Sequence, residues 1–356
     1  MIIVRTPLRV SFFGGGTDHP GWFKHHGNGA VLSTTIDKYV YITLRPTPPV
    51  FDFKYRVVWR QVEQTNTLDE IEHPVVREVL RHYCDEGSAY EIVYNADLPA
   101  RSGLGSSSAF TVAALHALAH REDQPISKMW LAQEAIRVEQ DLLQEPVGSQ
   151  DQTAVAFGGF NHIAFGKDGS LQVTPTSASP DRLAALQGSL MMFFTGFTRD
   201  AGSIEKSKVE NFANRRDQLD KVYNMVGQAQ TILEDDSISL DEFGKLLDDG
   251  WQAKRSLANG VSNGAIDQAY ALAIQAGALG GKLLGAGGGG FLLFYVPPEK
   301  QAAVAAAMST FQFQPGKATA HVPFRFDQDG SSVVLHRPDL TSNYPSTGSS
   351  RRYSAA

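Results

Sequence analysis

The fold is decided by the stretch Asn95-Ala96-Asp97-Leu98-Pro99-Ala100-Arg101-Ser102-Gly103-Leu104-Gly105-Ser106-Ser107-Ser108-Ala109, which continues into an Ala- and Leu-rich run to residue 119. Its first part predicts a strand end and a turn, and its last part predicts a helix. The first N–H groups of a helix lack intrahelical partners, and the helix dipole adds about half a positive charge, so this end attracts anions. Gly103 and Gly105 allow a phosphate to approach the backbone, and the serines add hydroxyl groups. The alternative is a serine-capped helix that follows a flexible loop.

Two further glycine-rich segments lie on either side of this phosphate-binding stretch in the sequence. Gly14-Gly15-Gly16-Thr17-Asp18 follows an alternating apolar run over residues 2–13, which Pro7 should divide into two short strands. Gly285-Ala286-Gly287-Gly288-Gly289-Gly290 has the Gly-x-Gly-x-x-Gly spacing of a dinucleotide fingerprint. However, a strand rather than a helix is expected after it, and no acidic residue follows about 20 positions on, so it does not predict a Rossmann fold.

The remaining patterns predict a chain of mixed α and β structure. Strands are expected over residues 30–44, 55–62, 90–95, 160–165 and 188–195, and short strands are expected after the last helix up to Leu335. Helices are expected over residues 73–83, 106–120, 127–143, 203–233, 239–258, 263–276 and 299–310. The segment from residue 338 lacks an apolar period and is expected to be disordered.

Composition excludes several classes of function. The chain has 356 residues, 42% of them hydrophobic, and is therefore long enough for two lobes. A formal net charge of −6 argues against nucleic acid as a general partner. The single cysteine, Cys84, excludes an intrachain disulfide, and no Cys/His cluster indicates zinc. Because no apolar run is long enough for a signal peptide or a membrane span, we expect a cytoplasmic protein without a membrane partner.

Three motifs, in order, resemble those of the GHMP kinases, which are named for galactokinase, homoserine kinase, mevalonate kinase and phosphomevalonate kinase. They are Pro7-x-Arg9-Val10-x-Phe12-Phe13-Gly14-x-x-Thr17-Asp18, Pro99-x-x-x-Gly103-Leu104-Gly105-Ser106-Ser107-x-Ala109, and Lys282-x-x-Gly285-Ala286-Gly287-Gly288-Gly289-Gly290. The resemblance covers residues 1 to about 335 and implies an α+β GHMP kinase fold. An N-terminal α/β lobe of the ribosomal-protein type is expected over residues 1–185 and a ferredoxin-like C-terminal lobe over residues 186–337, with ATP in the cleft between them and a tail over residues 338–356.

The resemblance also implies roles for individual residues. Asp151 matches the aspartate that is the catalytic base of galactokinases, and Arg9 would stabilise the transferred charge or keep Asp151 ionised. Ser107, at the helix start, is placed to offer a hydroxyl group to Mg²⁺, and Glu139 matches the metal-binding glutamate of the family. The residues expected around the phosphates of ATP are Ser102, Gly103, Leu104, Gly105, Ser106, Ser107 and Ser108. The alternatives are that Glu139 is an exposed helix charge and that Asp151 is a loop aspartate.

The expected acceptor is a sugar phosphate. Gly-Gly-Gly-Thr-Asp replaces the Gly-Glu-His-Thr-Asp of galactokinases, so two side chains of the sugar pocket are missing and a bulkier or phosphorylated sugar is expected. Together with Gly148-Ser149-Gln150-Asp151-Gln152 and Thr195-Gly196-Phe197-Thr198-Arg199, this resembles the branch that phosphorylates the anomeric hydroxyl of a heptose 7-phosphate. The expected substrate contacts are Asp18, Gly15, Gly16, Thr17, Gly287 and Gly288, with Arg199 as the first choice for the 7-phosphate and Lys24 and Lys206 as weaker choices.

Two other interpretations stay open. One is a different GHMP sugar 1-kinase, acting on fucose, galactose or a free hexose. The other is a catalytically silent relative that binds ATP and a sugar; the joint presence of Ser107, Glu139 and Asp151 favours a kinase instead. The expected ligands are therefore ATP, Mg²⁺ and a sugar phosphate. The long C-terminal helices leave two alternatives open: they form the interface of a homo-oligomer, or they only cover the sheet.

Overall fold

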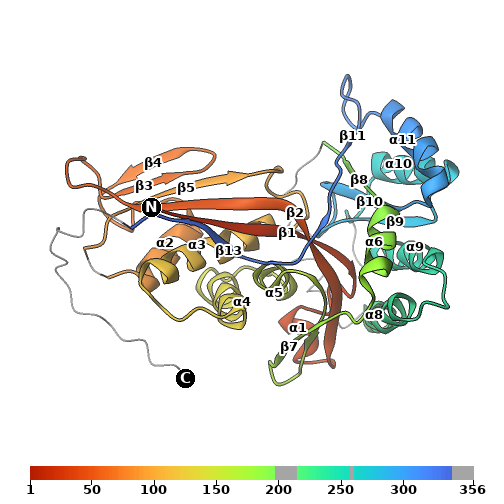
Figure 1. The fold of residues 1–356 in the computed structure, drawn as a ribbon, viewed down its shortest axis with the longest axis horizontal. Helices are drawn as coiled ribbons and strands as arrows, with labels where there is room; N and C mark the ends of the chain where they lie inside the picture. The colour runs from red at the N-terminus through yellow and green to blue at the C-terminus, as the bar shows by residue number, and fades with distance from the viewer. Residues whose placement is uncertain (86, 197–214, 257–259, 339–356) are drawn as a thin grey trace.

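The computed structural model describes residues 1–85, 87–196, 215–256 and 260–338. They form two lobes, each built on one β-sheet with helices packed against it (Figure 1). The prediction of an α+β chain with two lobes is therefore confirmed. Arg199 and Lys206, and the first part of the helix predicted over residues 203–233, lie outside the described residues.

The first sheet contains nine strands of the described residues, six of them in the order β13-β1-β2-β5-β3-β4. The nine are β1 (Ile2–Phe13), β2 (Gly29–Pro46), β3 (Tyr55–Val58), β4 (Val62–Thr65), β5 (Tyr90–Ala96), β6 (Phe160–Phe165), β7 (Leu171–Pro175), β12 (Phe326–Asp327) and β13 (Ser332–His336). β2 pairs with β6 along its first half and with β5 along its second half. This 18-residue strand is therefore the central element of the sheet.

Two strand predictions in this sheet were wrong in detail. β1 continues through Pro7, where only the register with β2 shifts between Pro7 and Leu8. The missing N–H of Pro7 is tolerated because β13 pairs only with residues 2–5 on the other side of β1. The strand predicted over residues 55–62 is a hairpin of β3 and β4.

Helices α2 (Pro74–Tyr83), α3 (Ser106–Arg121), α4 (Lys128–Ile136) and α5 (Gln150–Phe157) cover one face of this sheet (Figure 1). α3 is buried on nearly all sides, which explains its apolar sequence. The helix predicted over residues 127–143 is confirmed, but its second part, Arg137–Leu142, is a π-helical segment. A π-helical turn re-aims the side chains that follow it, and this one carries Glu139.

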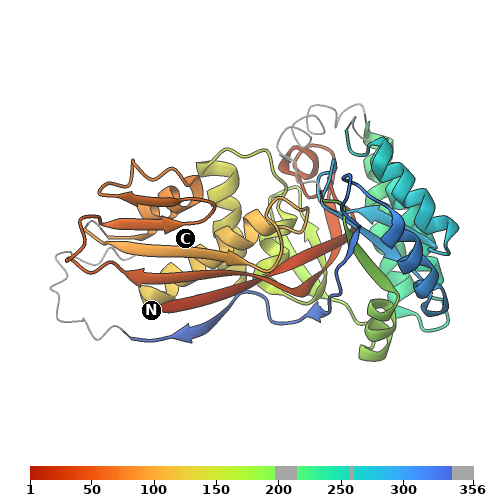
Figure 2. The ribbon, with the colours of Figure 1, turned by 90° about the horizontal axis from the view of Figure 1, so that it is seen from above.

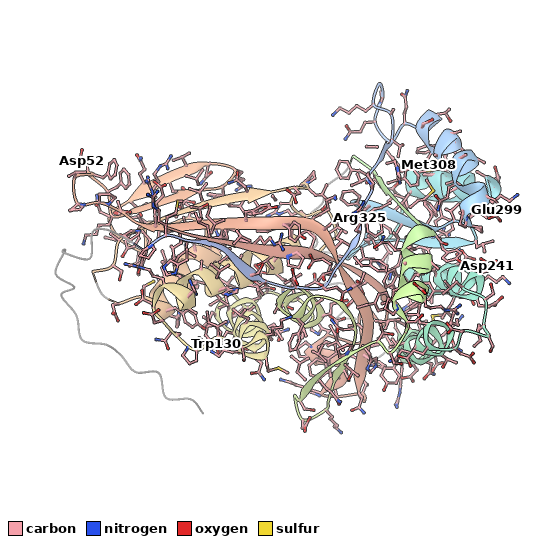
Figure 3. All side chains as sticks on the ribbon, viewed as in Figure 1. Asp52, Trp130, Asp241, Glu299, Met308 and Arg325 are labelled. Atoms are coloured by element: carbon pink, nitrogen blue, oxygen red, sulfur yellow. The ribbon has the colours of Figure 1, made fainter. Side chains whose placement is uncertain are left out.

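Within the described part of the chain, the second sheet has four antiparallel strands in the order β11-β8-β10-β9. They are β8 (Leu190–Phe194), β9 (Gly280–Leu283), β10 (Phe291–Tyr295) and β11 (Ala320–His321). The described helices of this second lobe are α8 (Arg216–Glu234), α9 (Asp241–Arg255), α10 (Gly264–Gln275) and α11 (Gln301–Thr310). Two other helices are α6 (Pro180–Gly188), between the lobes, and the short α1 (Pro20–Phe23), which follows the first glycine segment. Asp241 and Glu299, at the starts of α9 and of the turn before α11, lie on the outer side of this lobe (Figure 3).

The chain returns to the first sheet after β11. Arg325 lies where this crossing occurs (Figure 3), and β12 and β13 then run along the first lobe to the N-terminus (Figure 2). Phe326 of β12 pairs with Ile36, and Leu335 of β13 pairs with Ile3. The range 186–337, expected as one lobe, thus contains two strands that pair within the first sheet.

Candidate active site

A cavity of about 230 Å³ lies where the three glycine segments of the sequence meet. It is lined by residues 14–16 after β1, by Gly103 and residues 105–108 at the start of α3, and by residues 285–287 with Gly289 after β9. α5, α8 and α9 close its sides, with residues that include Asp151, Met225 and Lys254. Three segments more than 85 positions apart in sequence therefore share one site.

An ion pair between Arg9 and Asp151 lies in this cavity. Nε and Nη2 of Arg9 each donate a hydrogen bond of 2.8 Å to the Asp151 carboxylate, one to each oxygen. Nη1 of Arg9 donates to the carbonyl oxygen of Gly103 at 2.5 Å. The Arg9 side chain is only 4% exposed, whereas that of Asp151 is 27% exposed. The arginine is therefore a fixed donor inside the protein, and the carboxylate faces the cavity.

The start of α3 forms the wall of the cavity expected to hold phosphates. Gly105 is the N-cap, with a left-handed φ of 73°, and a Cβ atom built on it would lie 3.0 Å from Cγ of Arg9. Ser106, Ser107 and Ser108 line the cavity beyond it. The start of α3, where the first N–H groups lack intrahelical partners, thus borders the cavity.

Two residues predicted to contact ATP lie behind this wall. Ser102 and Leu104 are fully buried and do not line the cavity. The carbonyl oxygen of Leu104 accepts a hydrogen bond of 3.0 Å from the N–H of Arg9. A Cβ atom on Gly290 would lie 2.2 Å from the carbonyl oxygen of Ser102. Both residues therefore hold the loop against its neighbours.

Glu139 is buried between α3 and α5 at the edge of the cavity. Its Oε2 accepts hydrogen bonds from the hydroxyl group of Ser108 at 3.0 Å and from the amide of Gln152 at 2.5 Å. Its Oε1 is buried and has no hydrogen-bond partner of ordinary geometry among the described residues, although the nearby hydroxyl group of Thr111 favours the charged form of the carboxylate. Burial raises the pKa of Glu139 to about 8. The alternative that Glu139 is an exposed helix charge was wrong.

The hydroxyl group bonded to Glu139 belongs to Ser108, whereas Ser107 is the serine predicted to offer a hydroxyl group to Mg²⁺. Successive residues at a helix start are turned by about 100°, so a neighbouring serine faces a different side. Ser107 is exposed and lines the cavity, while Ser108 is buried. Among the described residues, no group of three or more His, Cys, Asp or Glu side chains could hold a metal ion.

The first glycine segment is arranged around Asp18. Oδ1 of Asp18 accepts a hydrogen bond of 2.8 Å from the N–H of Gly16, and Oδ2 accepts one of 3.3 Å from the N–H of Gln150. Thr17 does not line the cavity; its buried hydroxyl group donates to the carbonyl oxygens of the segment and of Ala30. Thr17 therefore shapes the turn, and Asp18, Gly15 and Gly16 face the cavity.

The third glycine segment contributes Gly287 but not Gly288 to the cavity lining. The N–H of Gly288 donates to the carbonyl oxygen of Val261 at 3.0 Å, which anchors the segment to the chain before α10. Of the cations proposed for a substrate phosphate, Lys24 does not line the cavity.

Two lysines of the cavity were not selected from the sequence. Nζ of Lys254, on α9, donates to the carbonyl oxygens of Leu283 and Gly285, at 2.9 and 2.5 Å. Nζ of Lys282, on β9, donates to carbonyl oxygens at the end of β1, at 2.8 and 2.5 Å. Lys282 is the first residue of the third motif, so the sequence could have identified it as a residue of the site. Lys254 has no local signal, because only the packing of α9 brings it to the cavity.

The chain is similar to known kinases over most of its length. The family GHMP kinases N terminal domain matches residues 72–159, and GHMP kinases C terminal matches residues 233–313. D-glycero-alpha-D-manno-heptose 7-phosphate kinase of Campylobacter jejuni is 29% identical over 303 residues, which are 80% of this chain and 86% of that protein. Galactokinase of Thermococcus kodakarensis is 25% identical over 321 residues, again 80% and 86% of the two chains.

Solved structures share the fold over most of the chain. The structure of a D-glycero-D-manno-heptose 1-phosphate kinase from Bacteroides thetaiotaomicron matches with a TM-score of 0.75 and 24% identity, covering 95% of this chain and all of that one. A putative sugar kinase from Campylobacter jejuni matches with a TM-score of 0.68 and 26% identity, covering 93% and 97%.

The GHMP kinases are ATP-dependent phosphotransferases, and the matched domains together with the kinases named above place this chain in that class of enzyme. The chain belongs to the GHMP kinases, and it carries both the N-terminal and the C-terminal domain of that family. The family and fold predicted from the three motifs are confirmed. No helix in the described part of the chain is long and apolar enough to cross a membrane.

Proposed function

We propose that this sugar kinase transfers the terminal phosphate of ATP to the anomeric (C1) hydroxyl group of D-glycero-D-manno-heptose 7-phosphate. The product would be the 1,7-bisphosphate, formed in the cytoplasm as a step towards GDP-heptose for surface polysaccharide. The observation that carries the proposal is the ion pair of Arg9 and Asp151 in the cavity between the phosphate-binding stretch and the third motif. The similarity to a heptose 7-phosphate kinase over 80% of the chain supports the choice of sugar.

Asp151 acts as the base in this mechanism. Phosphoryl transfer needs the acceptor oxygen and the terminal phosphate in line, together with a group that takes the acceptor's proton. Asp151 is the partly exposed carboxylate, and Arg9 fixes the direction of both of its oxygens. The start of α3 binds the phosphates of ATP through its N–H groups and through Ser106 and Ser107, which line the cavity.

The residues around Glu139 fit a bound Mg²⁺. One carboxylate oxygen of Glu139 has no hydrogen-bond partner of ordinary geometry among the described residues, and burial disfavours the charged form of the carboxylate. A cation beside this oxygen would give it a partner and would stabilise the negative charge. Glu139 and the hydroxyl groups of Ser107 and Ser108 would hold the ion, since Mg²⁺ prefers few protein carboxylates and oxygen ligands. When bound, Mg²⁺ neutralises charge on the phosphates.

The first glycine segment provides the space for the sugar. A Cβ atom on Gly15 would have its nearest neighbour at 3.7 Å, the amide nitrogen of Gln150, so the cavity stays open beside this glycine. Asp18, whose position is fixed by two backbone N–H groups, would accept a hydrogen bond from a sugar hydroxyl group. Arg199 stays a candidate for the 7-phosphate and lies outside the described residues.

Similarity to galactokinases favours a second candidate function, phosphorylation of a free hexose at C1. ATP turnover with Mg²⁺ should be measured on heptose 7-phosphate, heptose, galactose, fucose and mannose, with phosphorus NMR of each product. Turnover confined to heptose 7-phosphate, with the new phosphate at C1, is the expected result. Turnover on a free hexose alone would keep the kinase and replace the substrate. Binding of ATP and sugar without turnover would favour a silent relative.

A further inference from the structure

The phosphate-binding stretch holds an arginine, Arg101, in the left-handed backbone region. Its φ is 58°, which is unfavourable for any residue that has a Cβ atom. Two other non-glycine residues of the described chain have positive φ, Asp123 and Gln144. Each lies just past the end of a helical segment, where left-handed residues are common. Arg101 precedes a helix, so that explanation does not apply to it.

The backbone around Arg101 is held on both sides. Its N–H donates a hydrogen bond of 3.2 Å to the hydroxyl group of Ser106. The next residue, Ser102, is fully buried with its carbonyl oxygen against Gly290. The side chain of Arg101, by contrast, is exposed and lines the cavity. The loop thus keeps an arginine at a position where glycine would be the unstrained residue, and such an outlier in a ligand cavity points to a role for the side chain.

Arg101 also differs from the other cations that line the cavity within the described residues. Arg9 donates to Asp151, and Lys254 and Lys282 each donate to two backbone carbonyl oxygens. The guanidinium group of Arg101 makes no hydrogen bond or ion pair with the described protein. Four acidic side chains line the same cavity, so an anionic substrate needs a cation that is not already engaged.

We propose that Arg101 binds a phosphate group of a substrate and sets the affinity of the site for it. The guanidinium group matches phosphate oxygens with two parallel hydrogen bonds. The inference rests on the proposed function, in which such a group comes from one of two sources: the triphosphate of ATP or the 7-phosphate of the acceptor. Both present the same oxygen chemistry, and binding experiments separate them.

Arg101→Gly removes the side chain and relieves the backbone, so the variant should unfold at a higher temperature than the wild type. At the same time, the Kd of the substrate whose phosphate meets Arg101 should rise about tenfold or more, because hydrogen bonds to charged groups are the strong ones. Arg101→Lys keeps the positive charge but loses the two parallel N–H donors of the guanidinium group, and should give an intermediate Kd. The matched control is Asp123→Gly, which relieves the same backbone strain outside the cavity and should leave both Kd values unchanged.

Calorimetric titrations of each variant with each ligand show which phosphate group Arg101 binds. A higher Kd for a non-hydrolysable ATP analogue with Mg²⁺ assigns Arg101 to the nucleotide. A higher Kd for heptose 7-phosphate, with that of heptose unchanged, assigns it to the acceptor. Unchanged Kd values for both ligands in Arg101→Gly would overturn the inference. If the wild type phosphorylates only a free hexose, the proposed substrate is wrong, and the titration with the ATP analogue alone then decides the role of Arg101.

Discussion

A Cβ atom built on Gly285 would lie 2.4 Å from the Cα atom of Gly103, so the third motif and the loop before α3 touch through two glycines. Both have positive φ, 72° and 83°. Neither position can accept a side chain without moving one loop away from the other. The contact therefore fixes the width of the cavity between the lobes.

Gly285→Ala should separate these two loops. We expect a loss of about 1–3 kcal/mol in the free energy of unfolding, from overlap and from strain at positive φ, and a lower kcat. Chemical denaturation and steady-state kinetics measure the two effects. The control is Gly227→Ala on the exposed side of α8, where a Cβ atom meets nothing within 4 Å. It should stabilise the protein by about 0.5–1 kcal/mol and leave kcat unchanged. Equal behaviour of the two variants would contradict the role of the contact.

Asp151→Asn should bind ATP and sugar with nearly unchanged affinity and lower kcat by about 10²–10⁴, the usual contribution of a positioned base. Arg9 keeps one oxygen acceptor in this variant, so the cavity should retain its shape. Asp181→Asn is a suitable control, because Asp181 is also an acidic residue in the first turn of a helix but lies outside the cavity. A kcat within a few-fold of the wild-type value in Asp151→Asn would remove Asp151 from the base role.

Glu139 should make stability depend on pH when no Mg²⁺ is present. Its pKa is about 8 in the folded protein against 4.5 for an ordinary glutamate, so between these values the folded state binds more protons than the unfolded state. The free energy of unfolding should therefore fall as pH rises from about 4.5 to 8, by up to ~1.4 kcal/mol per pH unit. Urea denaturation in chelator at pH 5, 6.5 and 8 measures this slope. The Glu139→Gln variant should not show this slope. If the free energies of unfolding of the variant and the wild type depend on pH in the same way, Glu139 is not the source of the slope.

Lys282→Met should weaken the connection between the two lobes. The ammonium group of Lys282 on β9 bonds two carbonyl oxygens of β1, the strand that also carries Arg9. We expect a loss of about 1–3 kcal/mol in the free energy of unfolding, together with a lower kcat. In Lys245→Met the lost partner is Glu242 at the surface, so the cost should stay below about 1 kcal/mol. Similar losses in both variants would assign the effect to charge removal rather than to this connection.

The elements that carry sequence motifs were predicted most accurately. The glycine segments and the apolar helix after them have strong local signals, and α3 begins and ends within one residue of its predicted range. Arg9 and Asp151 were predicted to act together, and the structure places them in contact. The roles of these residues stay proposals until the variants above are measured.

Other features depend on contacts that sequence patterns do not encode. Whether Ser107 or Ser108 faces Glu139 depends on the rotation of α3 about its axis, and the π-helical turn at Arg137 changes the direction of Glu139. Lys254 reaches the cavity only through the packing of α9 against β9. The short strands predicted up to Leu335 are confirmed as β11, β12 and β13, but sequence patterns do not give their partners: β13 pairs with β1, more than 300 residues away.

That pairing has a consequence for synthesis on the ribosome. β1 is made more than 300 residues before its outer neighbour β13. Until then the outer edge of β1 has unpaired N–H and C=O groups, which is the kind of edge on which β-rich intermediates associate. The N-H of Arg337 finally bonds the carbonyl oxygen of Met1 at 2.8 Å. The sheet that contains β1 is therefore completed only after β13 has been made, and nascent chains stalled before residue 332 should require protection by chaperones.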